Sequence, residues 1–284
     1  MKILLTGAQG FIGSYFQKKY TTLYDFIGFS FRSHNINDIN FYGIECVIHL
    51  SALVHQMHGA SENAYEKVNV LQTIELAKEA KAKNVKHFIF MSSIKVYGEE
   101  SVVIYNEKTS CHPKDAYGKS KLKAEQLLQE LEDENFKVSI IRTPIVYGYG
   151  IKANIKNLIS LVNKIPLLPF GDIQNKRSMV YIGNLCHLID EIIKQEKPGI
   201  FLASDDNTLS TTQLIKLISK YLHKEVFLFY LPLFPILLKF LKPSFYNRLY
   251  GSLEVNNIQT KNALKLINPY SIEDGMKYMI HGEK

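Results

Sequence analysis

The sequence predicts an α/β protein built around a doubly wound parallel sheet. Three observations support this fold class. In the first half of the chain, short and nearly continuous apolar runs alternate with longer amphipathic segments, which is the pattern of βαβ units. A glycine-rich turn joins the first apolar run to the first amphipathic segment. Hydroxyl-bearing residues follow a later apolar run, where ligands meet the carboxyl ends of parallel strands.

The predicted strands are apolar runs of the kind that helices cover on both faces. They span residues 2–5, 26–31, 46–50, 87–91 and 138–141, with a further candidate at 200–203 after Pro198 and Gly199. The helices predicted between them have the length and apolar spacing of helices, and they span 11–20, 64–83 and 116–131. Asn84 suits a left-handed end of the second helix.

The regular alternation loosens after Tyr149, where prolines and glycines interrupt the pattern. We therefore expect a parallel-sheet domain over residues 1–149, completed by about 178–205. A smaller α+β domain is expected from about 150–177 and 206–284. The most apolar stretch, 227–241, is expected to supply two buried segments of this smaller domain.

The composition is that of a globular protein that needs no covalent support. The chain has 284 residues, of which 46% are hydrophobic and 21% charged. Its three cysteines form no CxxC pair, which argues against a disulfide framework and a zinc knuckle. A reducing, cytoplasmic location is expected.

The charge and the apolar runs limit the possible partners. Lysine and arginine number 34 against 27 acidic residues, but no basic run reaches five, so no nucleic-acid partner is expected and a small anionic ligand suits the charge. The first apolar run is too short for a secretory signal. The stretch 227–241 is broken by Pro232, Pro235 and Lys239, so it predicts no transmembrane segment and leaves membrane-surface attachment open.

Gly7, Gly10 and Gly13 lie where the first predicted strand meets the first predicted helix. Glycine permits a tight turn at the first position, lets a pyrophosphate approach the backbone at the second, and allows close helix-to-strand packing at the third. Free amides at the helix start favour an anion. The spacing is GxxGxxG, one residue from GxGxxG. A turn without a ligand is the alternative, and the strand-turn-helix context favours a dinucleotide site.

The end of the second predicted strand bears on the choice of dinucleotide. An acidic side chain at this place holds the ribose hydroxyls of NAD, whereas this chain has Ser30, Phe31 and Arg32. Arg32 can meet a 2′-phosphate, so NAD and NADP both remain candidates. A solvated surface arginine is the alternative.

Tyr117 and Lys121 are four residues apart on one face of a predicted helix. Tyr15 and Lys19 share this spacing on the first helix, so spacing alone is a weak signal in a chain with 17 tyrosines. Position separates the two pairs. Tyr117 follows a predicted strand that leads to Ser93, so a phenol and a hydroxyl converge at the carboxyl edge of the sheet. Tyr15 lies where the first helix should pack.

This combination suits hydride transfer between a carbinol and a nicotinamide, because a proton must then leave or reach the same oxygen. An unperturbed tyrosine, with a pKa of about 10, is too weak an acid for this task. The ammonium of Lys121 and an oxidised nicotinamide would both favour the phenolate. We expect Lys121 also to bond the nicotinamide ribose, and Ser93 to hold the reacting oxygen. An ordinary strand-end hydroxyl is the alternative for Ser93 alone.

Four motifs are spread along the chain. They are GxxGxxG at 7–13, Ser-Ser at 92–93 followed by Val-Tyr-Gly at 96–98, Tyr-Gly-Lys-Ser-Lys at 117–121, and Arg-Thr-Pro-Ile-Val-Tyr-Gly at 142–148. Together they resemble the extended short-chain dehydrogenase/reductases that act on nucleotide sugars, which implies a Rossmann-type fold. The resemblance extends to Leu-Ser-Ala at 50–52, to Asn69 and to the tail at 252–256 and 271–275.

The resemblance implies NAD or NADP as cofactor, a UDP-sugar as substrate and no metal. The implied catalytic residues are Tyr117, Lys121 and Ser93. The implied cofactor contacts are Gly7, Gln9, Gly10, Phe11, Ile12, Gly13, Arg32, Asp38, Leu50, Ser51, Ala52, Asn69, Ser92, Tyr117, Lys121 and Pro144. The implied substrate contacts are Ser93, Tyr117, Asn154, Arg177 and Arg248. A guanidinium fork suits a diphosphate, and a structural arginine is the alternative for Arg177.

The two residues after Ser93 bear on the reaction. Sugar 4,6-dehydratases of the resembling family usually place an Asp-Glu pair there, whereas this chain has Ile94 and Lys95. Two activities at carbon 4 of a UDP-linked hexose remain, a 4-epimerase and a 4-ketoreductase. A reductase must exchange its spent cofactor, and the absence of an acid beside Arg32 favours such exchange and hence the reductase. The resembling branch is associated with the synthesis of surface polysaccharide precursors.

Three further expectations complete the sequence analysis. A non-catalytic cofactor-sensing or RNA-binding protein on the same fold is the alternative function, which the complete catalytic set disfavours. His55 and His58 have a spacing that can meet a metal, but no third ligand is evident nearby, so ordinary loop histidines are expected. A homodimer through the helices 64–83 and 116–131 is a possible assembly that the resemblance suggests.

Overall fold

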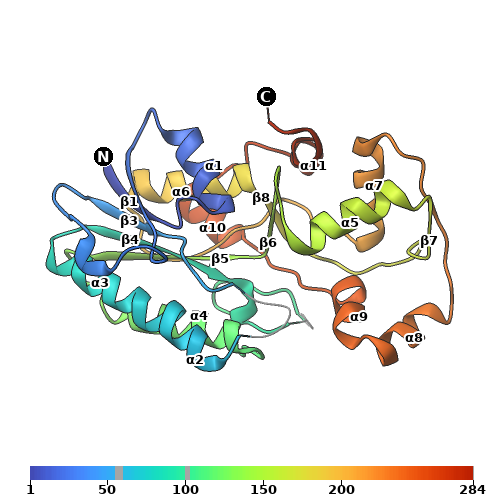
Figure 1. Ribbon diagram of the computed structural model, residues 1–284, viewed down its shortest axis with the longest axis horizontal. Coiled ribbons are helices and arrows are strands. Elements are labelled where there is room, and N and C mark those ends of the chain that lie inside the picture. The colour runs from blue at the N-terminus through green and yellow to red at the C-terminus, as the bar shows by residue number, and fades with distance from the viewer. Residues whose placement is uncertain (55–59, 100–102, 284) are drawn as a thin grey trace.

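A six-stranded parallel sheet forms the centre of the protein. The computed structural model describes residues 1–54, 60–99 and 103–283 (Figure 1). The strands of the sheet are β1 (Lys2–Thr6), β2 (Asp25–Phe29), β3 (Cys46–His49), β4 (His87–Ser93), β5 (Lys137–Thr143) and β9 (Gly199–Leu202). They lie in the order β2-β1-β3-β4-β5-β9, and every neighbouring pair is parallel. This confirms the predicted fold class.

Helices cover both faces of the sheet. Figure 1 shows α1 (Phe11–Tyr20) and α6 (Ile182–Gln195) on one side and α3 (Gln72–Ala82) and α4 (Ala116–Gln129) on the other. The strands alternate accordingly, because successive side chains point to opposite faces. In β1, Ile3 and Leu5 join the core beneath α1 and α6, whereas Leu4 joins the core beneath α3 and α4. All three side chains are fully buried.

The strand order determines where a ligand can bind. Chain direction along the sheet reverses between β1 and β3, because the chain first runs outward to β2 and then returns to the other side of β1. Loops leave the carboxyl ends of β1 and β3 in opposite directions at such a switch point and leave a crevice for a ligand. The glycine turn follows β1 and the Leu-Ser-Ala segment follows β3, so the two segments meet there. A 3₁₀ turn (Ile36–Asp38), and no further strand, lies between β2 and β3.

The turn from β1 into α1 is closely packed, and glycine is required in it. Gly7 has a φ of +71°, and a Cβ on Gly13 would lie 2.4 Å from the carbonyl oxygen of Gly7. A side chain at position 13 would therefore push α1 away from the end of β1. These contacts explain two of the three predicted glycine roles.

The helix predicted at 64–83 is interrupted by a π-helical segment. It consists of α2 (Glu62–Tyr65), a π-helix (Glu66–Leu71) and α3, and it ends at Asn84, whose φ is +62°. The predicted left-handed end at Asn84 is therefore confirmed. The π segment was not predicted, because widening of a single turn leaves no clear mark on apolar periodicity. Such segments are frequent at functional sites.

The remaining elements form the part of the molecule beside the sheet. They are β6 (Ile145–Tyr147), α5 (Ala153–Lys164), β7 (Leu167–Leu168), β8 (Met179–Tyr181), α7 (Thr211–Leu222), β10 (Phe227–Leu228), α8 (Phe234–Leu241), α9 (Pro243–Tyr250), α10 (Ile258–Leu264) and α11 (Ile272–His281). Helix α5 packs against α7, whereas α10 packs against β9 and α6 of the sheet region. A 3₁₀ turn (Ile94–Val96) follows β4.

One expectation about this second region is wrong. The stretch 227–241 was expected to supply buried segments, but no residue of α8 is buried and Phe240 is 81% exposed. Apolar composition predicted a core helix, whereas the short helix sits at the edge of the molecule and only part of it touches the interior. No helix among the described residues is long and apolar enough to cross a membrane.

Gly13→Ala tests the packing of the glycine turn. We expect it to lower the free energy of unfolding by about 1–3 kcal/mol, because the added Cβ must displace the backbone of Gly7. Ser14→Ala is the control, because Ser14 is exposed and its hydroxyl bonds only to backbone oxygens within the same turn. Urea unfolding followed by circular dichroism measures both, and equal effects would contradict this account.

Candidate active site

The start of α1 presents backbone amides at the switch point. Gly10 is the N-cap of α1, and no side chain caps this end of the helix. A Cβ on Gly10 would lie 3.0 Å from the Gly7 carbonyl oxygen, so the turn is narrow. Gln9 and Gly10 are exposed, and Phe11 and Ile12 are half-buried. An uncapped helix start with an open approach is a suitable binding place for a phosphate.

The segment after β3 lies directly beside this turn. A Cβ on Gly7 would come within 3.1 Å of the Leu50 carbonyl carbon and of the Ser51 nitrogen. The Ser51 amide donates to Thr6 Oγ1 at 3.3 Å, which ties the segment to the end of β1. The structure therefore brings Gly7 together with the predicted contacts Leu50 and Ser51, which lie far from it in the sequence, and Ala52 is the next residue of that segment.

Asn69 holds the next residue of the same segment. Its side-chain amide accepts from the Leu53 nitrogen at 2.8 Å and donates to the Leu53 carbonyl at 3.0 Å, and it also donates to Ser120 Oγ at 3.0 Å. Asn69 is buried and lies in the π-helical segment. Asn69, a predicted cofactor contact, therefore links the segment after β3 to helix α4 through its hydrogen bonds.

A buried histidine that the sequence analysis did not single out lies beneath these loops. His49 Nδ1 lies 2.7 Å from Thr6 Oγ1, and His49 Nε2 lies 3.0 Å from Thr73 Oγ1. Burial, with a smaller effect of the nearby Lys121, lowers the pKa of His49 to about 3, so the ring is neutral. In the sequence, a histidine at the end of an otherwise apolar strand was the signal that could have identified this residue.

Ser93 and Tyr117 meet at the carboxyl end of β4. The Ser93 hydroxyl lies close enough to the phenol to influence its pKa, and Ser93 also accepts from the Lys95 amide at 3.3 Å. Burial raises the pKa of Tyr117 to about 12, and the neighbouring Ser93 hydroxyl opposes this rise. Asp115 and the neighbouring Tyr65, whose ring centroid is 6.0 Å away, raise the pKa slightly further. The predicted convergence of phenol and hydroxyl is therefore present in the structure.

Lys121 lies one helical turn beyond Tyr117 and is almost completely buried. Its Nζ donates to the Met91 carbonyl at 2.8 Å and lies 4.4 Å from the centroid of the Phe90 ring. Burial lowers the pKa of Lys121 to about 7, against a weaker raising effect of Glu125. The sequence analysis expected Lys121 to lower the pKa of Tyr117. Within the protein itself, Ser93 lowers the pKa of Tyr117, whereas Lys121 does not contribute to it.

A buried ion pair lies next to Lys121. Glu125 accepts from Arg142 Nε at 3.1 and 3.2 Å and from Arg142 Nη2 at 2.6 Å, and Arg142 Nη1 donates to the Tyr97 hydroxyl at 2.8 Å. Ser92 also donates its hydroxyl to Glu125. The predicted cofactor residue Ser92 thus directs its side chain into this network. Sequence reasoning missed Glu125, although an arginine in a buried strand signals a buried acidic partner.

The segment after β2 places Arg32 in solvent. Arg32 is exposed, and its guanidinium has no hydrogen-bond or ion-pair partner in residues 1–54, 60–99 and 103–283. Ser30 Oγ accepts from the Arg32 backbone amide at 3.4 Å. Asp38 is exposed at the end of the following 3₁₀ turn, and its carboxylate accepts from the Asn35 amide at 2.8 Å. Both side chains are placed on the β2 side of the switch point.

The predicted substrate contacts lie in the second region of the molecule. Asn154 is exposed in the first turn of α5. The Nη1 of Arg177 donates to carbonyl oxygens near the end of α9, at 2.8 Å to Arg248 and at 3.3 Å to both Asn247 and Gly251. Arg177 thus holds the end of α9, which favours the structural alternative left open for this residue. The side chain of Arg248 is half-buried on the same helix.

An open cavity of about 630 Å³ lies beside the loop that follows β4. Tyr97, Tyr105, His112 and Lys114 line it from this loop, and Asn247 lines it from α9. Ser93 and Tyr117 are not among its lining residues in the described parts of the chain. Pro144 is buried directly after β5, at the same edge of the sheet as Ser93.

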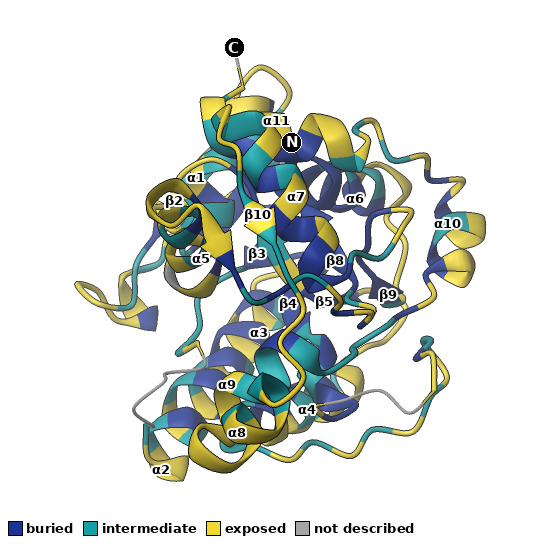
Figure 2. Ribbon diagram, turned by 90° about the vertical axis from the view of Figure 1, so that its right-hand side faces the viewer, coloured by how far each residue is buried: buried dark blue, intermediate teal, exposed yellow. Residues whose placement is uncertain are grey.

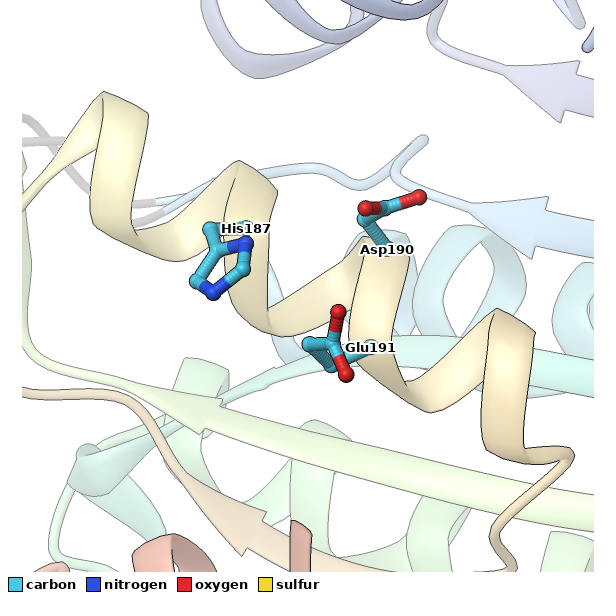
Figure 3. Close-up of side chains that lie close together, drawn as sticks. All are labelled: His187, Asp190 and Glu191. Atoms are coloured by element: carbon cyan, nitrogen blue, oxygen red, sulfur yellow. The ribbon is translucent and has the colours of Figure 1, made fainter. Parts of the chain in front are cut away.

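Two groups could be considered as metal sites. His187, Asp190 and Glu191 lie close together on α6 (Figure 3). Both carboxylates already have partners. Tyr24 donates to Asp190 at 2.6 Å and Lys194 pairs with Asp190 at 2.6 Å, whereas Gln195 donates to Glu191 at 3.0 Å. The cluster lies on α6, apart from the Ser93 and Tyr117 pair. The HxxH pair His55 and His58 lies outside the described residues.

Comparisons with known proteins agree with this geometry. The model of the NAD dependent epimerase/dehydratase family matches residues 3–203. UDP-glucose 4-epimerase of Vibrio cholerae is 37% identical over 305 residues, which cover 97% of this chain and 93% of that relative. N-acetyl-alpha-D-glucosaminyl-diphospho-ditrans,octacis-undecaprenol 4-epimerase of Escherichia coli O157:H7 is 27% identical, covering 81% of this chain and 75% of that relative.

A solved structure has the same fold. UDP-glucuronic acid 4-epimerase from Bacillus cereus, in complex with NAD, superimposes with a TM-score of 0.80 at 20% identity, over 99% of this chain and 98% of that one. The family match covers well over half of the chain, and the matched residues include the glycine turn and Ser93, Tyr117 and Lys121. The chain belongs to the NAD dependent epimerase/dehydratase family.

Proposed function

We propose that the protein catalyses the NAD(P)-dependent 4-epimerisation of a UDP-linked hexose. The observation that carries the proposal is the closeness of the Ser93 hydroxyl to the Tyr117 phenol, with buried Lys121 one turn along α4, at the sheet edge that carries the glycine turn. The relatives named above are 4-epimerases. They favour an epimerase over the 4-ketoreductase to which the segment around Arg32 pointed. A non-catalytic function is not favoured.

The residues present fit a dinucleotide. The start of α1 offers uncapped amides, and the backbone at Gly10 is free of a side chain, so a pyrophosphate can approach closely. Leu50 and Ser51 flank this place, and Asn69 holds the loop that continues from them. Arg32 and Asp38 lie at the ribose and adenine side of the switch point. When bound, the dinucleotide supplies the acceptor and donor of the hydride at carbon 4.

In this proposal Tyr117 moves the proton and Ser93 orients the sugar. Tyr117 takes the proton of the 4-hydroxyl while carbon 4 is oxidised, and returns it when carbon 4 is reduced. Ser93 donates a hydrogen bond to the same oxygen and holds it beside the phenol. Epimerisation requires that the second reduction reach the other face of carbon 4, so the 4-keto sugar must turn within the site.

The state of Lys121 controls the phenol. A pKa of about 12 keeps Tyr117 protonated at neutral pH, so the site needs positive charge next to the ring before Tyr117 can act as a base. The pKa of about 7 means that Lys121 can carry that charge or release it near neutrality. We propose that Lys121 also donates a hydrogen bond to the nicotinamide ribose. Its ammonium has three donor hydrogens, and the Met91 carbonyl accepts from one of them.

The residues after Ser93 supply no group for eliminating water. Ile94 is buried, and Lys95 is paired with Asp115 and lies 3.5 Å from Glu99. A dehydratase needs an additional acid and base at the sugar, and neither an aliphatic chain nor a lysine already held by two carboxylates provides them. This supports a reaction confined to carbon 4.

The UDP side of the substrate is assigned to the second region. We propose that Asn154 and Arg248 contact the nucleotide diphosphate, with Arg177 in support. Arg177 binds the carbonyls at the end of α9 and so fixes the position of Arg248 on that helix. We further propose a second domain made of about residues 150–177 and 206–284, and a homodimer through the helical segments 64–83 and 116–131. We also propose a cytoplasmic location, which the three unpaired cysteines support.

A second candidate substrate is a hexose on a polyprenyl diphosphate. The Escherichia coli O157:H7 relative is named for such a substrate. The observation that favours it here is the large apolar surface of α8, described below, in the region assigned to the substrate. Conversion of UDP-hexoses alone, of polyprenyl-linked hexose alone, or of both distinguishes the candidates.

Tyr117→Phe tests the proposed chemistry. We expect kcat to fall by about 100-fold or more, because the general acid and base is removed, while dinucleotide affinity stays within about twofold. The assay follows the interconversion of UDP-galactose and UDP-glucose, and of the N-acetyl pair, without added reduced cofactor. Tyr15→Phe is the control, since Tyr15 precedes Lys19 with the same spacing but bonds to Glu283 near the chain end. Full activity of Tyr117→Phe would overturn the assignment. Consumption of NADH or NADPH with a UDP-4-keto sugar, and no interconversion, would identify a reductase instead.

Lys121→Met should stabilise the protein, and more so at low pH. The folded protein gives up the Lys121 proton near pH 7, whereas an unfolded lysine holds it to about 10.5, so the cost of burying this charge is full below pH 7 and fades as the pH rises. We expect a gain of about 1–2 kcal/mol at pH 6 that shrinks toward pH 10. Urea unfolding at several pH values measures it, with Lys119→Met, on the exposed side of α4, as control. A gain independent of pH would contradict the lowered pKa.

Arg32→Ala tests the choice of dinucleotide. Because the Arg32 guanidinium is exposed and unpaired within the described residues, we expect the substitution to weaken NADP binding by about tenfold and to leave NAD binding nearly unchanged. Calorimetry with both dinucleotides measures this, and Lys18→Ala, an exposed cation on α1, serves as control. Equal losses for the two dinucleotides would remove the 2′-phosphate role.

A further inference from the structure

Helix α8 has apolar side chains on two faces and packs only one of them. Phe234 and Leu238 touch the core, and the Phe234 ring lies 6.0 Å from the ring of Phe170. The outward side chains are between 56% and 81% exposed. They are Leu233, Ile236, Leu237, Phe240 and Leu241, here called the α8 surface. Figure 2 shows α8 coloured as exposed along most of its length. A soluble helix normally has polar residues on its outer face.

The apolar character continues beyond α8. Phe227 in β10 is paired with Leu167 in β7, and the two side chains are 67% and 53% exposed. Tyr230, in the connection from β10 to α8, is 60% exposed. Figure 2 shows β10 and α8 on the same face of the molecule. Exposed apolar side chains gathered on one face mark a place where a protein binds something else.

The stretch of chain that contains the α8 surface carries charge of one sign. Residues 226–253 contain no aspartate or glutamate, and the flanking acids are Glu225 and Glu254. Lys239 and Lys242 lie within this stretch and are exposed. Apolar and aromatic side chains together with lysines, and without acids, form the composition of segments that lie in the boundary of an anionic bilayer.

The length of α8 limits how it can meet a bilayer. It has eight residues and is therefore about 12 Å long, far short of the ~30 Å hydrocarbon core. Pro243 begins the next helix directly after it. The geometry suits a helix that lies in the plane of the membrane surface and inserts one face only.

We propose that the α8 surface docks this protein onto an anionic bilayer. The five apolar side chains enter the headgroup and acyl boundary, and Lys239 and Lys242 meet lipid phosphates. This goes beyond the proposed reaction on a UDP-linked hexose and does not depend on it, because no residue of the α8 surface belongs to the Ser93, Tyr117 and Lys121 site or to the UDP contacts assigned to Asn154 and Arg248.

A second copy of the chain fits this face less well. A twofold interface would place the same surface on both sides. Lys239 and Lys242 would then face lysines of the other copy, and no acid in 226–253 could compensate them. A membrane with anionic headgroups supplies both the apolar layer and the opposite charge.

The protein lacks tryptophan, so a single introduced tryptophan reports on its own surroundings. Phe240→Trp and Ile267→Trp form a matched pair, because both native side chains are 81% exposed and Ile267 lies in the connection between α10 and α11. With vesicles of equal parts phosphatidylglycerol and phosphatidylcholine, we expect a blue shift for Phe240→Trp and none for Ile267→Trp. No shift for Phe240→Trp, or equal shifts for both, would overturn the proposal.

Flotation of the vesicles tests the same surface without a reporter. We expect the bound fraction of the double variant Phe240→Ser, Leu241→Ser to fall at least tenfold. We expect the double variant Lys239→Gln, Lys242→Gln to bind more weakly at low salt, and raised salt to weaken binding of the parent in the same way. Activity on a UDP-hexose and the Tm should stay unchanged in these variants, which separates failed docking from failed folding or a wrong reaction. If Phe240→Ser instead converts a dimer into a monomer and the parent binds no vesicles, the surface is a self-association interface and the proposal is wrong.

Discussion

The buried ion pair between Glu125 and Arg142 is the constraint on which the arrangement of the site depends. Their side chains are 1% and 5% exposed, and the pair joins α4 to β5. An unpaired charge at this depth would cost several kcal/mol, so α4 cannot slide along the sheet without a large penalty. Tyr117 and Lys121 lie eight and four residues before Glu125 on the same helix. The pair therefore determines which turn of α4 faces the end of β4.

Around this pair, burial has opposite effects on the two groups that handle charge. Removal from water disfavours the charged form of each, so it raises the pKa of Tyr117 and lowers that of Lys121. Both are consequently biased toward neutrality in the protein itself. The site is therefore mostly uncharged before a ligand binds. A positive charge brought next to the phenol favours the phenolate, which is the reactive form, so binding of a charged ligand would activate Tyr117.

Apolar periodicity and motif position are local signals. The sequence therefore predicted the sheet and its flanking helices, and it singled out Ser93, Tyr117 and Lys121 as candidates. It did not predict the roles that depend on contacts between distant segments. Arg177 binds carbonyls about 70 residues further along the chain, and Glu125 meets Arg142 only after α4 has packed on β5. The exposure of the 227–241 stretch was missed for a related reason. Composition reports how apolar a segment is, whereas burial depends on what the rest of the fold places over it.

The loop that leads from β4 to Tyr117 is held in place by residues 254–260, which follow it by about 150 residues. Tyr105 donates its amide to the Glu254 carbonyl at 3.0 Å and accepts from the Asn256 amide at 2.7 Å, and Glu107 accepts from the Thr260 amide at 3.0 Å. During synthesis, residues 254–260 leave the ribosome long after the sheet strands β1 to β5. The loop therefore cannot reach its final position until residues 254–260 have been made, so the surroundings of Tyr117 are completed after the strands of the sheet.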